Sequence, residues 1–282
     1  MSRRRATQAA PAAACVVVLA GLTAVLYAAM VGTAAGRRLE ALARFSGAWR
    51  NDTARHAGNA LLHAVVPLAV AAAVVIVIWT ARNRRRREGW AALALLAVAN
   101  VAAQALKPVL ERTDPTGGEA LRATAGAFPS GHAALAGSAA LAVAMIAPPR
   151  GRLAVVVAGA VLVTAVDLSL LAMGWHYPSD IVAGGLIALA AALAVQPGWA
   201  RLSARAALGG MLVAFAVGLL AGAALAGARP GRDGALTLGA IAVAAVPLGT
   251  MLGLSGRPSR PEAAPAREPQ PTARYPTATP SP

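Results

Sequence analysis

Long apolar runs constrain the fold of this chain more than any other feature of its sequence. Because hydrocarbon about 30 Å thick is crossed by roughly 20 residues of α-helix, runs of this length predict transmembrane helices. The chain has 57% hydrophobic and only 13% charged residues, far outside the balance of soluble domains. Eight runs meet or approach the required length, near residues 12–35, 59–80, 89–107, 132–148, 153–173, 180–196, 207–228 and 234–254. The predicted fold class is therefore all-α, a polytopic transmembrane helix bundle in a membrane bilayer.

The basic residues predict an orientation for these spans. A net charge of +15 would suit nucleic acid, but the arginines stand in short clusters between apolar runs, so no nucleic-acid partner is expected. Alternate connections, starting with the N-terminus, carry the larger share of the 26 basic residues. The positive-inside rule then predicts cytoplasmic termini and extracytoplasmic loops at 108–131 and 174–179. The connection 36–58 weakens this preference, because it carries arginines on the outer side.

A first polar cluster follows the end of the third run. Asn100, Gln104 and Lys107 are spaced by four and three residues, which places them on one helical face, and Arg112 follows shortly after. Ionisable groups are costly in membrane spans, so these residues are candidates for function. The alternative is a plain stop signal in which the Lys107 side chain reaches to the interface.

A second cluster, Phe128-Pro129-Ser130-Gly131-His132, stands directly before the fourth run. A helix that begins here leaves unpaired backbone N–H groups and the positive end of its dipole facing the loop, which is a site suited to an anion. Ordinary roles remain open as well: Ser130 as the helix N-cap, Pro129 and Gly131 as turn residues, and His132 as an interfacial side chain.

A third cluster, Gly174 to Asp180, stands directly before the sixth run. A carboxylate four residues after a histidine, as in His176 and Asp180, can hold one imidazole nitrogen and leave the other free. Helix capping by Ser179 and Asp180 is the structural alternative. All three clusters fall at one predicted face of the membrane, a coincidence that independent capping does not explain.

At these residues the sequence resembles the type 2 phosphatidic acid phosphatase superfamily, the membrane relatives of vanadium haloperoxidases. The resemblance covers roughly residues 60–196 and is specific in the order and spacing of its motifs. The matching segments read Lys107-Pro-Val-Leu-Glu-Arg112-Thr-Asp114-Pro115, then Pro129-Ser130-Gly131-His132, then Ser169-Leu170-Leu-Ala-Met-Gly-Trp-His176-Tyr-Pro-Ser-Asp180.

The resemblance implies a phosphatase that works through a phosphohistidine. According to this resemblance, His176 is the nucleophile and Asp180 fixes the His176 tautomer. His132 protonates the leaving oxygen and later activates water. The family's phosphate-binding groups correspond here to the side chains of Lys107, Arg112 and Ser130 and to the backbone N–H of Gly131. The implied substrate is a lipid phosphate, either phosphatidic acid or a polyprenyl phosphate or diphosphate.

Two positions depart from the family pattern. Asp114 and Leu170 stand where the family usually has phosphate-binding arginines. Arg112 is expected to substitute for the first arginine and Arg122 in the outer loop for the second. Asp167, an acid inside the fifth span, is expected to orient one of these cations, with a polar contact inside the bundle as the alternative.

No cofactor and no metal are expected, because two histidines without a carboxylate pair or a cysteine set make a weak metal site. One alternative keeps the fold without the turnover, as a phosphate-lipid binding or translocating protein whose site lost its arginines. A transporter or channel has less support, because the sequence shows no paired broken helices or matching halves.

The chain is expected to fall into four parts. Residues 1–58 form the N-terminal tail, first span and outer loop, and residues 59–196 form the lipid phosphatase core. Residues 197–254 form two additional transmembrane helices. Residues 255–282 are rich in Pro, Ala, Thr and Arg, which predicts a disordered tail. With the first span the core has six helices, and two C-terminal spans follow.

Overall fold

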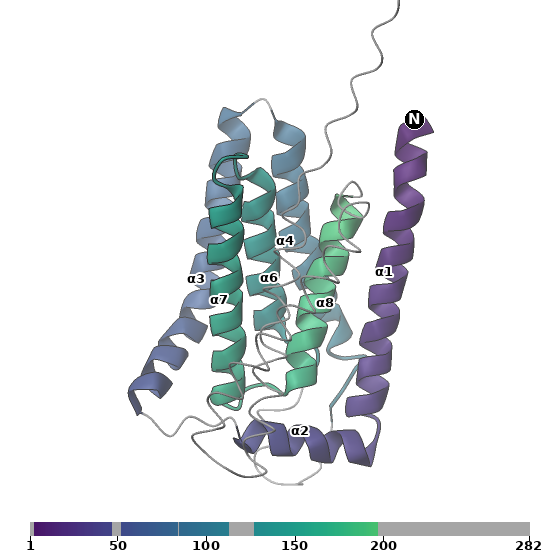
Figure 1. Cartoon of the computed structure of the whole chain (residues 1–282), viewed down its shortest axis with the longest axis vertical. Helices are drawn as coiled ribbons and strands as arrows, with labels where there is room; N and C mark the ends of the chain where they lie inside the picture. The colour runs from purple at the N-terminus through teal and green to yellow at the C-terminus, as the bar shows by residue number, and fades with distance from the viewer. Residues whose placement is uncertain (1–2, 47–51, 84, 113–126, 197–282) are drawn as a thin grey trace, which may run out of the picture.

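The computed structural model describes residues 3–46, 52–83, 85–112 and 127–196, and in these ranges all regular secondary structure is α-helical (Figure 1). Five of its helices are long and apolar enough to cross a membrane, and α6 is shorter but equally apolar. The helices are α1 (Arg3–Met30), α2 (Ala34–Ser46), α3 (Asp52–Arg82), α4 (Arg86–Leu106), α6 (Gly131–Ile146), α7 (Arg152–Ala172) and α8 (Pro178–Val195). The all-α membrane fold is thus confirmed. Five of the predicted spans appear as α1, α3, α4, α7 and α8, and the run 132–148 appears as the shorter α6. Spans seven and eight, with the tail 255–282, lie outside the described residues.

The bundle is built around α6. This helix packs against α3, α4, α7 and α8, whereas α1 lies at the edge and packs mainly against α8. The buried face of α6 is made largely of small residues, among them Ala133, Ala134 and Gly137. Small side chains let helix backbones approach closely, and van der Waals packing then supplies the association energy that water would supply in a soluble core.

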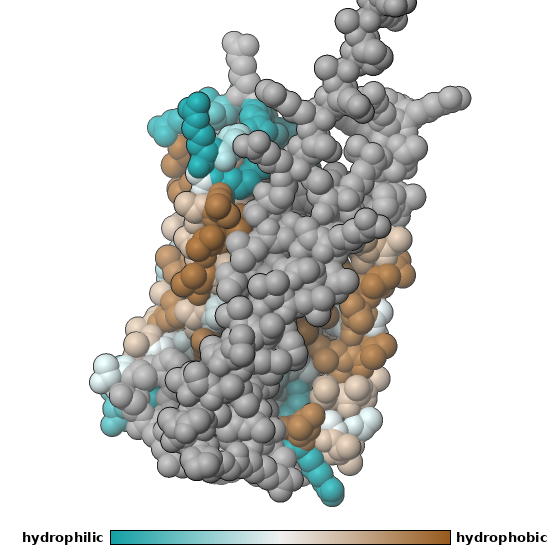
Figure 2. Space-filling view, viewed as in Figure 1, coloured by the Kyte–Doolittle hydropathy of each residue, from teal (hydrophilic) through white to brown (hydrophobic). Residues whose placement is uncertain are grey.

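The outer surface of the bundle is apolar along its length. Figure 2 shows brown hydrophobic side chains along its sides and teal hydrophilic ones toward its ends. The exposed apolar residues include Val17 and Leu22 of α1, Val74 of α3 and Val161 of α7. Such exposure is costly in water and expected in hydrocarbon, which agrees with the membrane interpretation.

The connection after the first span contains a helix, α2, that the sequence analysis treated only as an outer loop. The Thr33 hydroxyl caps this helix by accepting a hydrogen bond from Gly36 N at 2.9 Å. Instead of running along the bundle, α2 lies across the end at which α6 and α8 begin (Figure 1). This position brings an additional helix to the end of the bundle that carries the polar motifs.

Candidate active site

The three polar clusters meet at one end of the bundle. Lys107 is the C-cap of α4, Ser130 is the N-cap of α6, and Asp180 lies in the first turn of α8. Ser130 N donates a 2.8 Å hydrogen bond to the backbone oxygen of Asp180, which joins the beginnings of α6 and α8. The motifs that the sequence placed at separate helix ends therefore form one site.

Lys107 lies against the first turn of α6. A Cβ atom built on Gly131 would be 3.5 Å from Lys107 Nζ and 3.1 Å from Gln104 Nε2, so both side chains lie over the Gly131 backbone. Ser130 is fully buried, and its hydroxyl accepts a hydrogen bond from Ala133 N at 3.3 Å. Lys107 thus adds a positive charge to a helix N-terminus that already favours anions.

The two histidines of the motifs lie next to each other. The ring centroids of His132 and His176 are 6.4 Å apart. The two imidazoles are thus close enough to act on one phosphoryl group. Trp175 packs edge-on against His132 with centroids 5.8 Å apart, and His63 of α3 packs on Trp175 at 5.9 Å. His63 has no motif around it, so the sequence gives no sign of its place near the site.

Asp180 lies behind His176. Its Oδ2 is 3.4 Å from His176 Nδ1 and accepts a 2.9 Å hydrogen bond from Tyr177 N. The turn that carries His176 from α7 into α8 needs a positive φ at Gly174, where φ is 67°. His176 and Asp180 are both buried, so the carboxylate faces Nδ1 and leaves Nε2 as the nitrogen available for chemistry.

Arg112 is turned toward Asp180 rather than toward open space. Its Nη2 lies 2.9 Å from Asp180 Oδ1 and donates to Ser179 Oγ at 2.7 Å, and its Nη1 donates to Glu40 Oε2 at 2.5 Å. The guanidinium also stacks 4.3 Å from the ring centroid of Tyr177. The expected role of Arg112 as a phosphate ligand stays a prediction, because both terminal nitrogens already have protein partners.

Glu40 is a residue of this end of the bundle that the sequence analysis missed. It comes from α2, it is only 3% exposed, and its Oε1 accepts a hydrogen bond from Ser179 N at 2.9 Å. In the sequence Glu40 is only an acidic residue in a connection whose other charged residues are mainly arginines. Nothing in that pattern indicates that Glu40 is buried.

The accessory residues of the sequence analysis do not join the site in the described ranges. Asp167 is fully buried in α7, and neither of its carboxylate oxygens has a hydrogen-bond partner among the described residues. Leu170 is fully buried in the apolar core. Arg122 and Asp114 lie outside the described residues. The cation that Asp167 is expected to orient is therefore still a prediction.

In the part of the chain that the structure describes, no group of three or more His, Cys, Asp or Glu side chains is arranged to hold a metal ion. The functional groups near the paired histidines are instead a lysine, a helix N-terminus and a buried carboxylate. The expectation of metal-independent chemistry stays a prediction.

Fold and site together define a multi-pass helical membrane protein with a paired-histidine, anion-attracting site. The family model of the PAP2 superfamily matches residues 88–202 of the chain. No curated protein and no solved structure matches the chain. This match supports phosphatase-type activity on phosphate esters, and the matched segment includes Lys107, His132 and His176.

Proposed function

We propose that this protein hydrolyses the phosphate monoester or diphosphate of a membrane lipid, through a phosphohistidine on His176 and without a metal ion. The observation that carries the proposal is the adjacency of the His132 and His176 rings, 6.4 Å apart, beside Lys107 and the first turn of α6. Such an arrangement offers a nucleophile, an acid and a cradle for the phosphoryl oxygens around one phosphorus centre.

In the first step the lone pair of His176 Nε2 forms a bond to phosphorus while the bond from phosphorus to the ester oxygen breaks. Asp180, at 3.4 Å from Nδ1, stabilises the positive charge that develops on the ring. His132 gives its proton to the departing oxygen, which leaves as the lipid alcohol or, from a diphosphate, as the lipid monophosphate. The product of this step is His176 carrying the phosphoryl group.

In the second step water replaces His176 on phosphorus. His132, now neutral, takes a proton from the water as its oxygen attacks, and the bond between Nε2 and phosphorus breaks. Inorganic phosphate leaves and both histidines return to their starting states. Lys107 and the backbone N–H of Gly131 hold the equatorial oxygens in both steps, with Ser130 as a further ligand.

A lipid substrate suits the place of the site in the bundle. The paired histidines lie where α6 and α8 begin, and the helices continue from there as long apolar segments. A phosphate bound at this end leaves an attached acyl or prenyl chain beside hydrocarbon-facing surfaces. By the distribution of arginines we place this end on the extracytoplasmic side and both termini in the cytoplasm.

The direct test is phosphate release by the purified full-length protein in lipid nanodiscs. Phosphatidic acid, a polyprenyl monophosphate and a polyprenyl diphosphate are compared with a water-soluble alkyl phosphate, with and without EDTA. Release from at least one lipid substrate, unaffected by EDTA and faster than from the soluble ester, is expected. Binding of these lipids with no release would contradict the proposal and favour the alternative of a lipid-phosphate binding or translocating protein.

His132→Ala tests the assignment of the general acid. With an alkyl phosphate, loss of the proton donor is expected to slow phosphate release by about 100-fold or more. An aryl phosphate has a leaving oxygen that needs little protonation, so it still phosphorylates His176. The phosphohistidine is then hydrolysed slowly, because His132 is missing as the base that activates water. Stopped-flow measurement is expected to show a burst of the phenol equal to the enzyme concentration, followed by slow turnover.

The control is His56→Ala, which removes an exposed histidine of the same protein and is expected to keep turnover on both esters. Equal slowing of the burst for alkyl and aryl esters in His132→Ala would contradict the role of His132 as an acid.

A further inference from the structure

The buried ion network behind the catalytic pair begins on α2, outside the segment that matches the family. Glu40 Oε2 accepts from Arg112 Nη1 at 2.5 Å, and Arg112 Nη2 lies 2.9 Å from Asp180 Oδ1. The side chains of Glu40, Arg112 and Asp180 are 4%, 3% and 0% exposed. Charges this deeply buried interact far more strongly than surface pairs, and removing one leaves the others uncompensated.

Each carboxylate in the network divides its two oxygens between different partners. Asp180 Oδ1 forms an ion pair with Arg112, whereas Asp180 Oδ2 accepts a hydrogen bond from Tyr177 N and faces His176. Glu40 Oε2 accepts a hydrogen bond from Arg112, and Glu40 Oε1 accepts one from Ser179 N, the backbone of the residue before Asp180. Glu40 therefore contacts both the cation beside Asp180 and the backbone turn that carries Asp180.

The charges in this network have a consequence for His176. Arg112 with Asp180 alone is a neutral pair, in which the guanidinium draws the negative charge of Asp180 away from the imidazole. With Glu40 ionised as well, two carboxylates share one guanidinium, and the network keeps a net negative charge beside His176. That charge favours the positive imidazole that forms when His176 attacks phosphorus.

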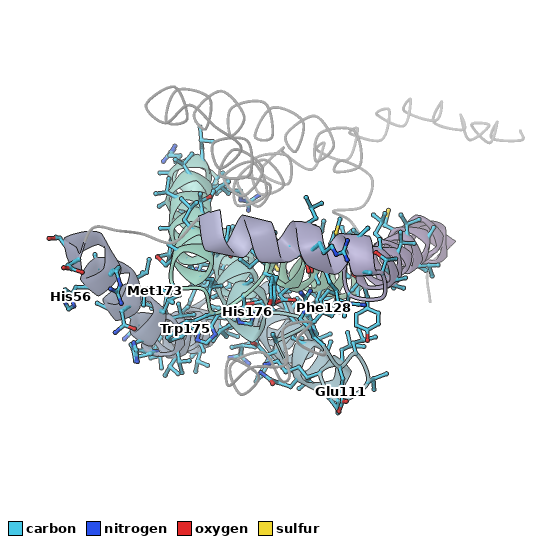
Figure 3. The ribbon with its side chains drawn as sticks, turned by 90° about the horizontal axis from the view of Figure 1, so that it is seen from below. His56, Glu111, Phe128, Met173, Trp175 and His176 are labelled. Carbon is cyan, nitrogen blue, oxygen red and sulfur yellow. The ribbon has the colours of Figure 1, made fainter. Side chains whose placement is uncertain are left out.

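We propose that Glu40 is a positioning residue for His176 and Asp180. Acting through Arg112, it holds Asp180 behind His176 and keeps a net negative charge next to the imidazole. This inference rests on the proposed function. It assigns a role in the reaction to α2, which lies across the end of the bundle in the view of Figure 3. It also makes Arg112 the ion-pair partner of Asp180 instead of a ligand of the substrate phosphate.

The kinetic test is Glu40→Gln in nanodiscs. Glutamine keeps an oxygen for Ser179 N but removes the charge opposite Arg112. We expect kcat to fall about 10- to 100-fold, the usual cost of losing an outer partner that orients a functional group, with KM nearly unchanged. The control is Glu111→Gln, which removes an exposed acid next to Arg112 in sequence and is expected to leave kcat unchanged.

The partner variants separate positioning from substrate binding. If Glu40 acts through Arg112, then Arg112→Gln and the double variant Glu40→Gln/Arg112→Gln have the same kcat, with KM near that of the wild type. If Arg112 binds phosphate instead, Arg112→Gln raises KM while Glu40→Gln leaves kcat intact, and the inference is overturned. Glu40→Gln leaves Arg112 paired with Asp180, so it leaves no lone buried charge, and size-exclusion chromatography in detergent checks that each variant is folded.

A second measurement does not depend on turnover. It is the rate at which diethyl pyrocarbonate modifies His176, as determined by peptide mass spectrometry. His56 is an internal reference, because it is exposed and lies at the outer end of α3, away from His176 (Figure 3). In Glu40→Gln, where the network is left neutral, modification of His176 relative to His56 is expected to slow several-fold. An unchanged ratio in the folded variant would overturn the inference. Absence of phosphatase activity in the wild type would remove the proposed function, yet this ratio would still decide the role of Glu40.

Discussion

His176→Ala is expected to abolish phosphate release while the protein stays folded, with turnover lower by about three orders of magnitude or more. The physical reason is that alanine offers no lone pair to phosphorus, so the reaction loses its covalent route entirely. The fold should persist, because Asp180 keeps its contacts with Tyr177 N and Arg112. Release of phosphate from the preferred lipid, with size-exclusion chromatography in detergent as the check on folding, measures the effect.

A labelled phosphoryl group gives the same assignment a second readout. Brief incubation of the wild type with a labelled substrate, followed by rapid quenching, should leave label on His176 that is stable in base and lost in acid, as expected for a phosphoramidate. His56→Ala should keep both the label and the turnover. Full turnover of His176→Ala would exclude His176 as the nucleophile.

Gly184→Ala is expected to have a large effect, because Gly184 lies where α8 crosses the beginning of α6. A Cβ atom there would be 2.5 Å from the Ser130 backbone oxygen, 2.9 Å from Ala133 Cβ and 3.0 Å from Ala134 N. These contacts force the first turn of α6 away from α8, and a shift of about 1 Å at a reacting group costs about 100-fold in rate. We therefore expect kcat to fall by that order, together with a lower melting temperature from overpacking.

The neighbouring glycine provides the control for this variant. A Cβ atom on Gly185 meets nothing within 4 Å, so Gly185→Ala changes the same helix by the same methyl group in open space. This variant should keep its activity and its melting temperature. Wild-type kcat in Gly184→Ala would show that the contact between α6 and α8 does not set the geometry of the site.

The helices were readable from the sequence because the bilayer limits the alternatives. Hydrocarbon thickness sets the length of a span, and every backbone polar group inside it must bond within the helix. The six predicted runs of the described region accordingly appear as α1, α3, α4, α6, α7 and α8. The connection 36–58 was harder to interpret, because α2 within it is stabilised by local capping and by contacts with distant residues, and no fixed length marks such a helix.

The motif residues were readable for a related reason. Ser130 and Asp180 stand at helix beginnings, where local sequence fixes both the cap and the direction of the backbone N–H groups. The spacing of His176 and Asp180 likewise fixes their approach across a single turn. The direction of Arg112 was not readable in this way, because it depends on which carboxylates pack around the side chain.

The sequence alone determined that the chain is a helical membrane protein and that its lysine and two motif histidines stand at helix ends on one side. Local rules of span length, capping and spacing suffice for that. Only the tertiary structure placed α6 at the centre, set Gly184 against Ser130, and brought Glu40 to Ser179 across 139 residues of chain. Such contacts depend on how whole helices pack, and a buried charge acquires its partner only when the packing is complete.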